Sequence, residues 1–582
     1  MRVKINKGFT LVELLIASML VSLVFGGLLL TFGQTIKVIN ISKSKLTALS
    51  LANNRMEYFK SLPYNQIGTV SGIPSGNILQ SSYIVSNGIV FQERVLIEYV
   101  DDVADGQDTA TTSDSNGIPA DYKKIKLEYF WNIGNGTSSI SMFSNIVPRS
   151  IETDNGGGTV KVNVIDSKSV PLVGANVRLV NNTTTTTIDV TKNTDNNGIA
   201  LFSGAPAASD YELIVTKDNY STERTYEATS SNPIPVISNF SVVESGVSTL
   251  TFKIDKLSDI NILTYDDWWD EEFLEEFNDW SQVASSSGVH MDTGDLVLQK
   301  NGNYYENSGF VYLNPIIPSE LLRWESLRLA GFAGIDYNFK IKLFTATNSS
   351  YVVIPDSDLP GNSTSGFSDS LIDLSGLSTS TYKNLVVGVF LSTNNQTISP
   401  KVSEIAVYYT KHKSILPTVD LSIHGNKIIG TDNNSLPIYK YEISTSTNNN
   451  GRLFLKNMEF DEYNIIPNSS YVIATACPSH PLNHKAGLDS FLELVLKPPV
   501  TNSLRVSVMD DLGRPVPGAN VYLTQPGFAD SKKTNVCGQV FFDSGLSAGN
   551  NYKIKVNVEG YNEVILDPFS ISGNVTTLVN LN

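Results

Sequence analysis

The sequence has few of the residues that usually carry crosslinks or catalysis. Its 582 residues include only two cysteines, Cys477 and Cys537, which are too few for a scaffold framed by disulfides. The zinc-protease pattern H-E-x-x-H and the phosphate-binding pattern G-x-x-x-x-G-K-[ST] do not occur. The sequence therefore offers no constellation for an enzyme or a cofactor, and we expect neither.

Charge is scarce as well, at 17% of residues, and positive charge is the scarcer sign. The 42 Lys and Arg residues are outnumbered by 58 Asp and Glu residues, which gives a net charge of −16. This excess of acid argues against nucleic-acid binding by the body of the chain. Ser, Thr, Asn and Gly are abundant, with 25 Tyr and 25 Phe. That mixture is typical of β-rich extracellular domains, whose short strands are separated by polar turns.

The N-terminal region differs from everything that follows it. Arg2, Lys4 and Lys7 precede an apolar run over residues 9–32. About 20 residues suffice to cross a membrane, and basic residues before the run predict a cytoplasmic N-terminus. A cleaved secretory signal would be shorter and would end in an A-x-A-like site, but none follows Phe32. We therefore expect a single-pass protein of the cytoplasmic membrane.

Helical periodicity continues beyond this run. Apolar residues spaced three or seven apart predict one stripe on a helix, which Pro63 ends. Residues 9–62 would then form one helix, half in lipid and half outside, and the stripe would face partners. The stripe consists of Ile39, Leu46, Leu49, Met56 and Phe59.

The stretch KGFTLVELLIA, residues 7–17, resembles the processing site of type IV prepilins and related pseudopilins. The resemblance covers about the first 70 residues well. It implies that a prepilin peptidase cuts between Gly8 and Phe9 and that the new amino group of Phe9 is methylated. It also implies that Glu13, which becomes the fifth residue of the mature chain, serves assembly with other pilin subunits.

Glu13 is the one acid in the apolar run. A central acid costs about 2.5–3.5 kcal/mol on insertion scales, and less near an end, so a plain membrane anchor gains nothing from it. Glu13 lies about one helical turn after Phe9. Pairing with the Phe9 amine of a neighbouring subunit would offset the cost of an unpaired charge in lipid. The alternative is a plain signal anchor with a chance glutamate.

The rest of the chain is predicted to be mainly β and divided into several domains. Thr-x3-Gly followed by apolar residues recurs at Thr194, Thr447 and Thr534, and each copy has a downstream tyrosine. These copies resemble the carboxypeptidase regulatory-like, transthyretin-like domain, a binding sandwich with no catalytic residues of its own. The expected divisions are the leader 1–8, the helix 9–62, a pilin-like β domain 63–155, a transthyretin-like sandwich 156–257, a larger sandwich or jelly roll 258–413, a degenerate transthyretin-like sandwich 414–499 and a carboxypeptidase regulatory-like sandwich 500–582.

Residues 266–280 combine acids with aromatic side chains. Helical spacing would place Trp269, Phe273, Phe277 and Trp280 on one face. That face is either a platform for sugar stacking or the buried side of a short amphipathic segment. The second interpretation is favoured because the acids fit a solvated opposite face. The candidate ligand platform comprises Trp268, Trp269, Trp280 and Trp324.

Cys477, His480 and His484 have a C-x2-H-x3-H spacing. A structural zinc site uses four ligands and no fourth is evident, so we expect no metal. A disulfide between Cys477 and Cys537 is favoured if the compartment is oxidising. The pattern G-x-S-x-G at residues 545–549 lacks the later histidine that a hydrolase needs.

Together these features predict a structural protein for surface display. We expect a pilin-like subunit that enters a type IV pilus-like filament and presents β-sandwiches for adhesion to a surface glycan or protein. A filament arises when one surface patch binds a different patch on the next subunit without closing into a ring. Two alternatives stay open: a pseudopilin of a secretion system, and a surface carbohydrate-binding protein that uses the pilin-type helix only as an anchor.

Overall fold

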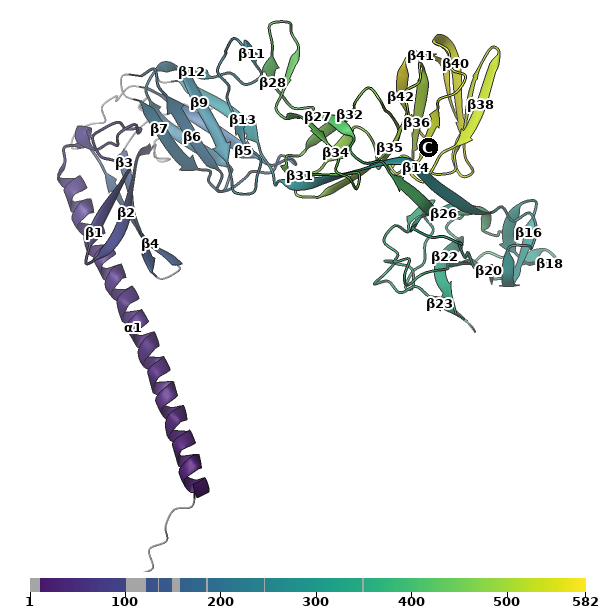
Figure 1. Cartoon of the computed structure of the whole chain (residues 1–582), viewed down its shortest axis with the longest axis horizontal. Helices are drawn as coiled ribbons and strands as arrows, with labels where there is room; N and C mark the ends of the chain where they lie inside the picture. Colours follow the sequence, from purple (N-terminus) through teal and green to yellow (C-terminus); the bar gives the residue numbers. More distant parts are fainter. Residues whose placement is uncertain are drawn as a thin grey trace, which may run out of the picture. The chain divides into compact units, whose positions relative to one another are not determined.

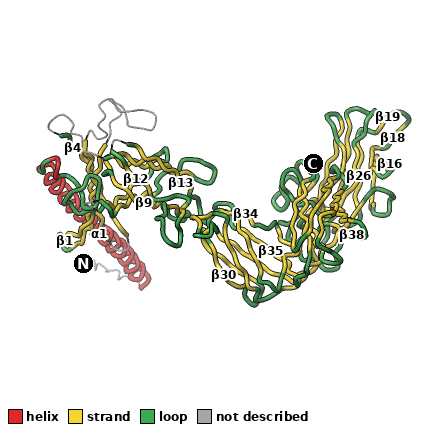
Figure 2. Tube along the Cα trace, turned by 90° about the horizontal axis from the view of Figure 1, so that it is seen from above, coloured by secondary structure: helices red, strands yellow, loops and turns green. Residues whose placement is uncertain are grey.

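The chain consists of one long helix followed by a body of strands (Figures 1 and 2). Two compact units divide it, Met1–Lys256 with Ile429–Ile438 and Leu257–Ile428 with Tyr439–Asn582. This agrees with the predicted fold class of a helix plus a mainly-β body. The computed structural model describes residues 11–100, 122–133, 136–148, 157–184, 187–244, 246–347 and 350–582.

Helix α1 (Leu11–Ser61) has 51 residues. It ends just before Pro63, because proline lacks an amide hydrogen and disfavours helical geometry in the preceding residue. A short 3-10 turn, η1 (Tyr64–Gln66), follows. Over the described residues, Ser18–Ser61 is long and apolar enough to include a membrane span.

A four-stranded antiparallel meander packs on the C-terminal half of α1 (Figure 1). Apolar and polar residues alternate in the sequence over residues 125–129, and the structure buries Ile125, Leu127, Tyr129 and Trp131 against the helix. The outward residues between them are polar or half-buried. The strands are β1 (Ser81–Ser86), β2 (Ile89–Val100), β3 (Tyr122–Ile133) and β4 (Gly136–Ile146).

The first repeat copy is a two-layer sandwich in the same unit. One layer has the order β13-β5-β8, and the other has β10-β9-β6-β7 with β12 beside β9. A small sheet, β11-β28-β29, lies apart from these layers. The strands are β5 (Gly158–Ile165), β6 (Asn176–Asn181), β7 (Ile188–Asn193), β8 (Ile199–Ala205), β9 (Ala208–Thr216), β10 (Glu223–Arg224), β11 (Ile234–Pro235), β12 (Phe240–Val242), β13 (Val247–Lys253), β28 (Ile428–Thr431) and β29 (Pro437–Tyr439).

The central region of the second unit forms a larger sandwich around Trp324 and 26 other buried residues. A five-stranded sheet, β15-β20-β25-β22-β23, faces the strands β16, β17, β21, β24 and β26 of a nine-stranded sheet. The strands are β14 (Ser258–Glu275), β15 (Val283–Ser287), β16 (Val289–Asp292), β17 (Asp295–Leu298), β18 (Lys300–Asn301), β19 (Tyr304–Tyr305), β20 (Ser308–Leu313), β21 (Arg323–Phe332), β22 (Tyr337–Ala346), β23 (Tyr351–Val353), β24 (Leu371–Asp373), β25 (Val386–Thr393) and β26 (Lys401–Ile415).

The other two repeat copies complete the second unit. In the first and last copies, the opening strand pairs antiparallel with the strand after Thr-x3-Gly and parallel with the closing strand. The strands are β27 (Asp420–Gly425), β30 (Glu442–Ser446), β31 (Arg452–Met458), β32 (Asp461–Pro467), β33 (Val472–Cys477), β34 (Leu482–His484), β35 (Ser490–Lys497), β36 (Ser503–Met509), β37 (Asn520–Gln525), β38 (Phe528–Lys533), β39 (Gln539–Phe542), β40 (Gly549–Asn557), β41 (Val564–Ile571) and β42 (Asn574–Asn580).

The middle copy takes its opening strand from far upstream. Residues 258–265 of β14 pair antiparallel with β31 and parallel with β35, the same arrangement as in the other copies. The larger sandwich is therefore inserted between the first and second strands of this copy. The expected boundary at residue 414 omitted that strand, which explains why the middle copy looked degenerate in the sequence.

The repeated Thr-x3-Gly motif builds the same turn three times. Gly198, Gly451 and Gly538 have φ values of 72°, 65° and 65°, which glycine adopts without a steric cost. The threonine before each glycine is buried, and its hydroxyl accepts a hydrogen bond from a distant backbone amide. The bonds are Ala175 N to Thr194 Oγ1, Val419 N to Thr447 Oγ1 and Ala519 N to Thr534 Oγ1, each 2.9 Å.

The repeat tyrosines are core residues that tie down a nearby loop. Tyr211, Tyr463 and Tyr552 are buried, and each phenol donates to a carbonyl oxygen four or five residues earlier. Tyr552 donates to the Ser547 carbonyl at 2.9 Å and accepts from the Ser547 amide at 3.1 Å. Ser547 of the G-x-S-x-G pattern thus belongs to a structural turn.

The last copy is crosslinked to the middle one. A disulfide joins Cys477 at the end of β33 to Cys537 in the turn before β39, with Cα atoms 5.5 Å apart. Beside it, Gln539 Nε2 donates to the Ala476 carbonyl at 2.6 Å and Gln539 Oε1 accepts from the Ala476 amide at 2.9 Å. These bonds hold the two sandwiches together along one contact.

Reduction of this disulfide should destabilise the C-terminal sandwich. Closing a loop with a sequence separation of 60 removes unfolded-state entropy worth about 4 kcal/mol in the chain-entropy model. We expect reductant to lower the unfolding temperature and to speed amide exchange in β36–β42. The Cys477→Ser/Cys537→Ser double variant is the control, since it should unfold like the reduced protein with or without reductant. Equal unfolding of oxidised and reduced protein would contradict the expectation.

Candidate assembly site

The predicted processing residues lie at the very start of the chain. Gly8 and Phe9 fall outside the described residues. The backbone of Glu13 belongs to α1. From Leu15 onward the helix exposes apolar side chains on all sides, as a segment surrounded by lipid or by other helices requires. They include Leu15, Ile16, Met19, Leu20, Val21, Leu23, Val24, Phe25, Leu28, Leu29 and Phe32.

The predicted apolar stripe divides into two parts. Met56 and Phe59 are buried against the sheet, but Ile39, Leu46 and Leu49 are 58%, 67% and 44% exposed. The prediction of one continuous stripe was therefore wrong. Between residues 44 and 52 the sheet side of the helix is lined by small residues, which let the two backbones approach closely, whereas Leu46 and Leu49 are exposed. The small buried residues are Ser44, Ala48 and Ala52.

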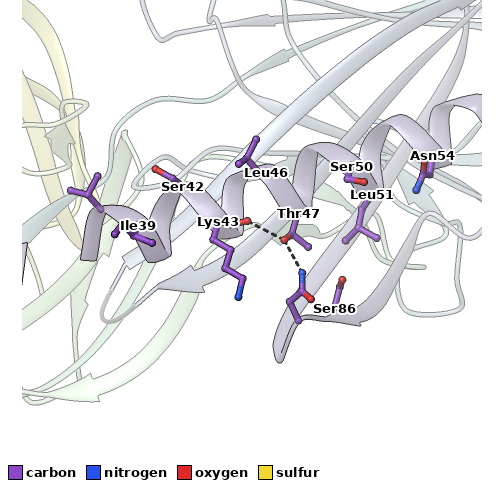
Figure 3. A pocket seen from close by; sticks show the side chains of 11 residues that line it. Ile39, Ser42, Lys43, Leu46, Thr47, Ser50, Leu51, Asn54 and Ser86 are labelled. Carbon is purple, nitrogen blue, oxygen red and sulfur yellow. Dashed lines mark hydrogen bonds between the residues drawn. The ribbon is translucent and has the colours of Figure 1, made fainter. Parts of the chain in front are cut away.

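A groove runs between the exposed part of the stripe and the β1–β2 hairpin (Figure 3). Its volume is about 800 Å³, and both aliphatic and hydroxyl side chains line it. Asn87 at the hairpin tip donates to Thr47 Oγ1 at 3.1 Å, and Thr47 donates to the Lys43 carbonyl at 3.0 Å. The hairpin is thereby tied to the helix and forms one wall. The lining residues are Val38, Ile39, Ser42, Lys43, Leu46, Thr47, Ser50, Leu51, Asn54, Ser86 and Asn87.

A buried carboxylate fixes the helix on the sheet. Glu93 is 1% exposed and lies on the inner face of β2. It forms an ion pair with Arg55 of α1 at 3.3 Å and accepts hydrogen bonds from Tyr129 and Ser82. Burial, followed by the hydrogen bond to Glu93, raises the pKa of Tyr129. Removing Arg55 would leave the buried Glu93 carboxylate without its ion-pair partner, which is strongly unfavourable.

A buried lysine holds the turn that follows the helix. Lys123 of β3 is 2% exposed, and its ammonium donates to the carbonyls of Tyr64 and Ile67, both at 2.8 Å. Its nitrogen also lies 4.4 Å from the centre of the Tyr64 ring. Desolvation by burial lowers the pKa of Lys123 to about 8. The direction of α1 relative to its sheet is thus fixed at Glu93 and again at Lys123.

The four tryptophans do not form the candidate ligand platform, which was the less favoured of the two interpretations. The segment after Asp266 continues strand β14, so the prediction of a helical face in this segment was wrong. Two register shifts, between Tyr265 and Asp267 and between Trp269 and Asp270, break the alternation that would have indicated a strand. Trp324 lies in the core and donates to the Tyr382 carbonyl at 2.8 Å. The others differ: Trp268 lies under the Lys413 ammonium, and Trp269 and Trp280 are exposed.

The C-x2-H-x3-H residues are used in other contacts. Cys477 is oxidised in the disulfide. His480 Nε2 accepts from the Ile465 amide at 3.0 Å, and burial, followed by the nearby Arg505 charge, lowers the pKa of His480 to about 4. His484 lies between the hydroxyls of Ser258 and Ser490. Within the described residues, no group of three or more His, Cys, Asp or Glu side chains is arranged to hold a metal.

Comparison with known proteins identifies the N-terminal segment. Residues 4–29 match the prokaryotic N-terminal methylation motif. No curated protein matches the sequence. The matched motif coincides with the start of the long apolar helix. The body is assigned to no family by these comparisons.

Several solved structures share a low similarity with this chain. The Bacillus anthracis TIE protein is 11% identical, with 86% of this chain and 73% of that chain covered and a TM-score of 0.16. BcpA, the major pilin subunit of Bacillus cereus, is 10% identical, with coverages of 73% and 99% and a TM-score of 0.13. The major pilin SpaD from Corynebacterium diphtheriae is 11% identical, with coverages of 73% and 97% and a TM-score of 0.13.

Lys123 predicts a pH dependence of the helix–sheet contact. Its folded pKa of about 8 lies below the ordinary value of 10.5. Between these values the unfolded chain binds more protons than the folded chain, so stability rises with pH in this window. Wild-type protein should gain stability from pH 8 to pH 10 relative to Lys123→Met, measured by amide exchange of residues 122–133. Lys124→Met removes a lysine from the opposite face of β3 and is the matched control. A constant difference between wild type and Lys123→Met would refute the assignment.

Proposed function

We propose that the protein is a subunit of a type IV pilus-like filament that displays β-sandwich domains at the cell surface for adhesion. The observation that carries this proposal is the continuity of the methylation motif over residues 4–29 with a 51-residue helix anchored on its own sheet. Prepilin peptidase would cut between Gly8 and Phe9, and the helix would hold the subunit in the cytoplasmic membrane before assembly. The excess of positive charge before the apolar run supports a cytoplasmic N-terminus.

The exposed aliphatic residues beyond the membrane span support assembly over simple anchoring. If residues 9–32 occupy the bilayer, Ile39, Leu46 and Leu49 lie outside it and expose apolar surface to water. A plain anchor gains nothing from such a surface, whereas a partner helix would bury it. The groove beside these residues is one patch, and the exposed apolar surface of the helix between Leu15 and Phe32 is a different patch. Contact between two unlike patches propagates as a filament when it does not close into a ring.

A secretion pseudopilin is the second candidate function, because the same motif and helix would serve it. The two functions differ in where the β-body is located. A displayed adhesin is accessible on intact cells, and a pseudopilin stays inside the envelope. Labelling of intact cells with a membrane-impermeant reagent therefore separates the two.

Replacing Gly8 should block processing. Gly8→Leu puts a bulky side chain at the proposed cleavage site, so the chain should keep residues 1–8 and an unmethylated N-terminus. Intact-mass spectrometry of membrane fractions reads both changes. Gly27→Ala is the control, because nothing lies within 4 Å of a Cβ at this helical position, and it should be cut normally. A wild-type chain of full, unprocessed mass would disprove cleavage.

Two helix variants should uncouple anchoring from assembly. Glu13→Gln removes the proposed partner of the Phe9 amine, and Leu46→Ser removes apolar surface from the groove. Each should lower recovery in sheared filaments by about tenfold, since about 1.4 kcal/mol is a factor of ten in an equilibrium, and each should leave membrane insertion unchanged. Leu512→Ser changes a leucine that is 71% exposed on the C-terminal sandwich and is the control. Normal filament recovery of Glu13→Gln would contradict the pairing.

A further inference from the structure

The five-stranded sheet of the larger sandwich has an unusual outward face. Its inward residues, among them Val311, Ile341 and Val389, belong to the hydrophobic core. The outward positions of such a sheet are normally polar because they face water. Here five aromatic residues from four strands occupy them. These residues are Phe310, Tyr312, Phe344, Tyr351 and Phe390.

The five rings form one cluster with Tyr312 at its centre. The Tyr312 ring lies 5.5 Å from Phe310, 5.2 Å from Phe344, 5.4 Å from Tyr351 and 5.8 Å from Phe390, measured between centroids. Several of these pairs are edge-to-face, which is a favourable geometry for aromatic rings. All of them except Phe344 keep part of their surface exposed to solvent. The cluster is therefore an organised aromatic floor that solvent can reach.

Gly388 allows the rings to close over the central strand. A Cβ at Gly388 would lie 2.8 Å from the Phe344 ring and 3.1 Å from the rings of Phe390 and Tyr312. Any larger residue would push these rings apart. The glycine thus has a specific role in building the floor.

Polar side chains flank the floor in a repeated cross-strand order. The register aligns Ser287, Phe310, Phe390 and Lys340 in one row across β15, β20, β25 and β22. In the next row the order is Ser285, Tyr312, Gly388 and Lys342. Each row has a serine at one end, aromatic surface in the middle and a lysine at the other end. Three strand spacings of 4.7–4.9 Å make each row about 14 Å wide.

The lysines are positioned and still have donors available. Lys340 donates to Ser368 Oγ at 3.3 Å, and Lys342 donates to the Ser363 carbonyl at 2.7 Å. An ammonium has three donors, so these contacts orient each lysine without using all of its hydrogens. Both bonds reach the same loop, which forms a rim along the lysine side.

We propose that this outward face is a binding platform for an oligosaccharide. A sugar ring has apolar C–H faces, which fit an aromatic floor, and peripheral hydroxyls, which fit donors and acceptors on both sides. A protein partner usually buries about 800 Å² on each side, so it would have to cover surface beyond these two rows, which are each about 14 Å wide. As the ligand site of an adhesin the platform rests on the proposed function. Its binding can nevertheless be measured without a filament.

The test uses the full chain, extracted from its membrane with a detergent that has no sugar headgroup. An array of neutral and acidic oligosaccharides finds a ligand, and calorimetry then gives its affinity. Tyr312→Ala and Phe390→Ala should each weaken binding by about tenfold, because aromatic residues contribute strongly at binding sites. Lys342→Ala should weaken it less. Tyr304→Ala, an exposed tyrosine on the β18–β19 hairpin of the same sandwich, is the matched control and should bind normally.

A further variant separates binding from folding. Tyr312→Leu keeps apolar volume in the cluster and removes the aromatic ring, so it should unfold at the wild-type temperature and still bind weakly. Wild-type protein that binds no oligosaccharide overturns the proposal. Undiminished binding by Tyr312→Leu and Phe390→Ala also overturns it, as does binding of proteins alone. Wild-type protein that binds sugar but is absent from sheared filaments would instead contradict only the proposed function.

Discussion

The close packing of α1 on its four-stranded sheet is the contact on which the N-terminal architecture depends. Ala48 and Ala52 let the backbones approach, and the ion pair between the half-buried Arg55 and the buried Glu93 adds a polar contact that is costly to break. Only the C-terminal half of the helix is used in this way. The chain therefore holds a long apolar rod rigidly at one end and leaves the rest of it for lipid or for other subunits.

The body depends on a different constraint, which is the pairing of long strands across sandwich boundaries. Strand β14 belongs to the middle repeat copy at its start and to the larger sandwich at its end, and it pairs with β26 along the latter part. Two domains that share a continuous strand cannot rotate freely about a linker. The disulfide between Cys477 and Cys537 then attaches the last copy to the same unit. The proposed oligosaccharide platform on this unit is thus held in place by sheet structure.

Local signals in the sequence predicted local structure well. Pro63 ended the helix, the alternation around Leu127 gave β3, and Thr-x3-Gly marked three identical turns. Predictions failed where distant residues decide the outcome. Register shifts in β14 imitated a helical pattern at Trp269, and the opening strand of the middle copy lies about 150 residues before the rest of it. The aromatic cluster around Tyr312 was missed because its rings come from four strands that only the sheet brings together.

Exposed apolar surface has two different chemical forms in this protein, and the difference indicates two kinds of partner. Along α1 it is aliphatic and follows the helix for many turns, which suits lipid and other helices because these bury long, smooth apolar surfaces. On the outward face of the larger sandwich it is aromatic, compact and bordered by Ser285, Ser287, Lys340 and Lys342. A surface with polar groups on both edges favours a ligand that alternates apolar faces with hydroxyls. Under the two proposals, Tyr and Phe serve recognition in the body, whereas Leu, Ile and Val serve assembly in the helix.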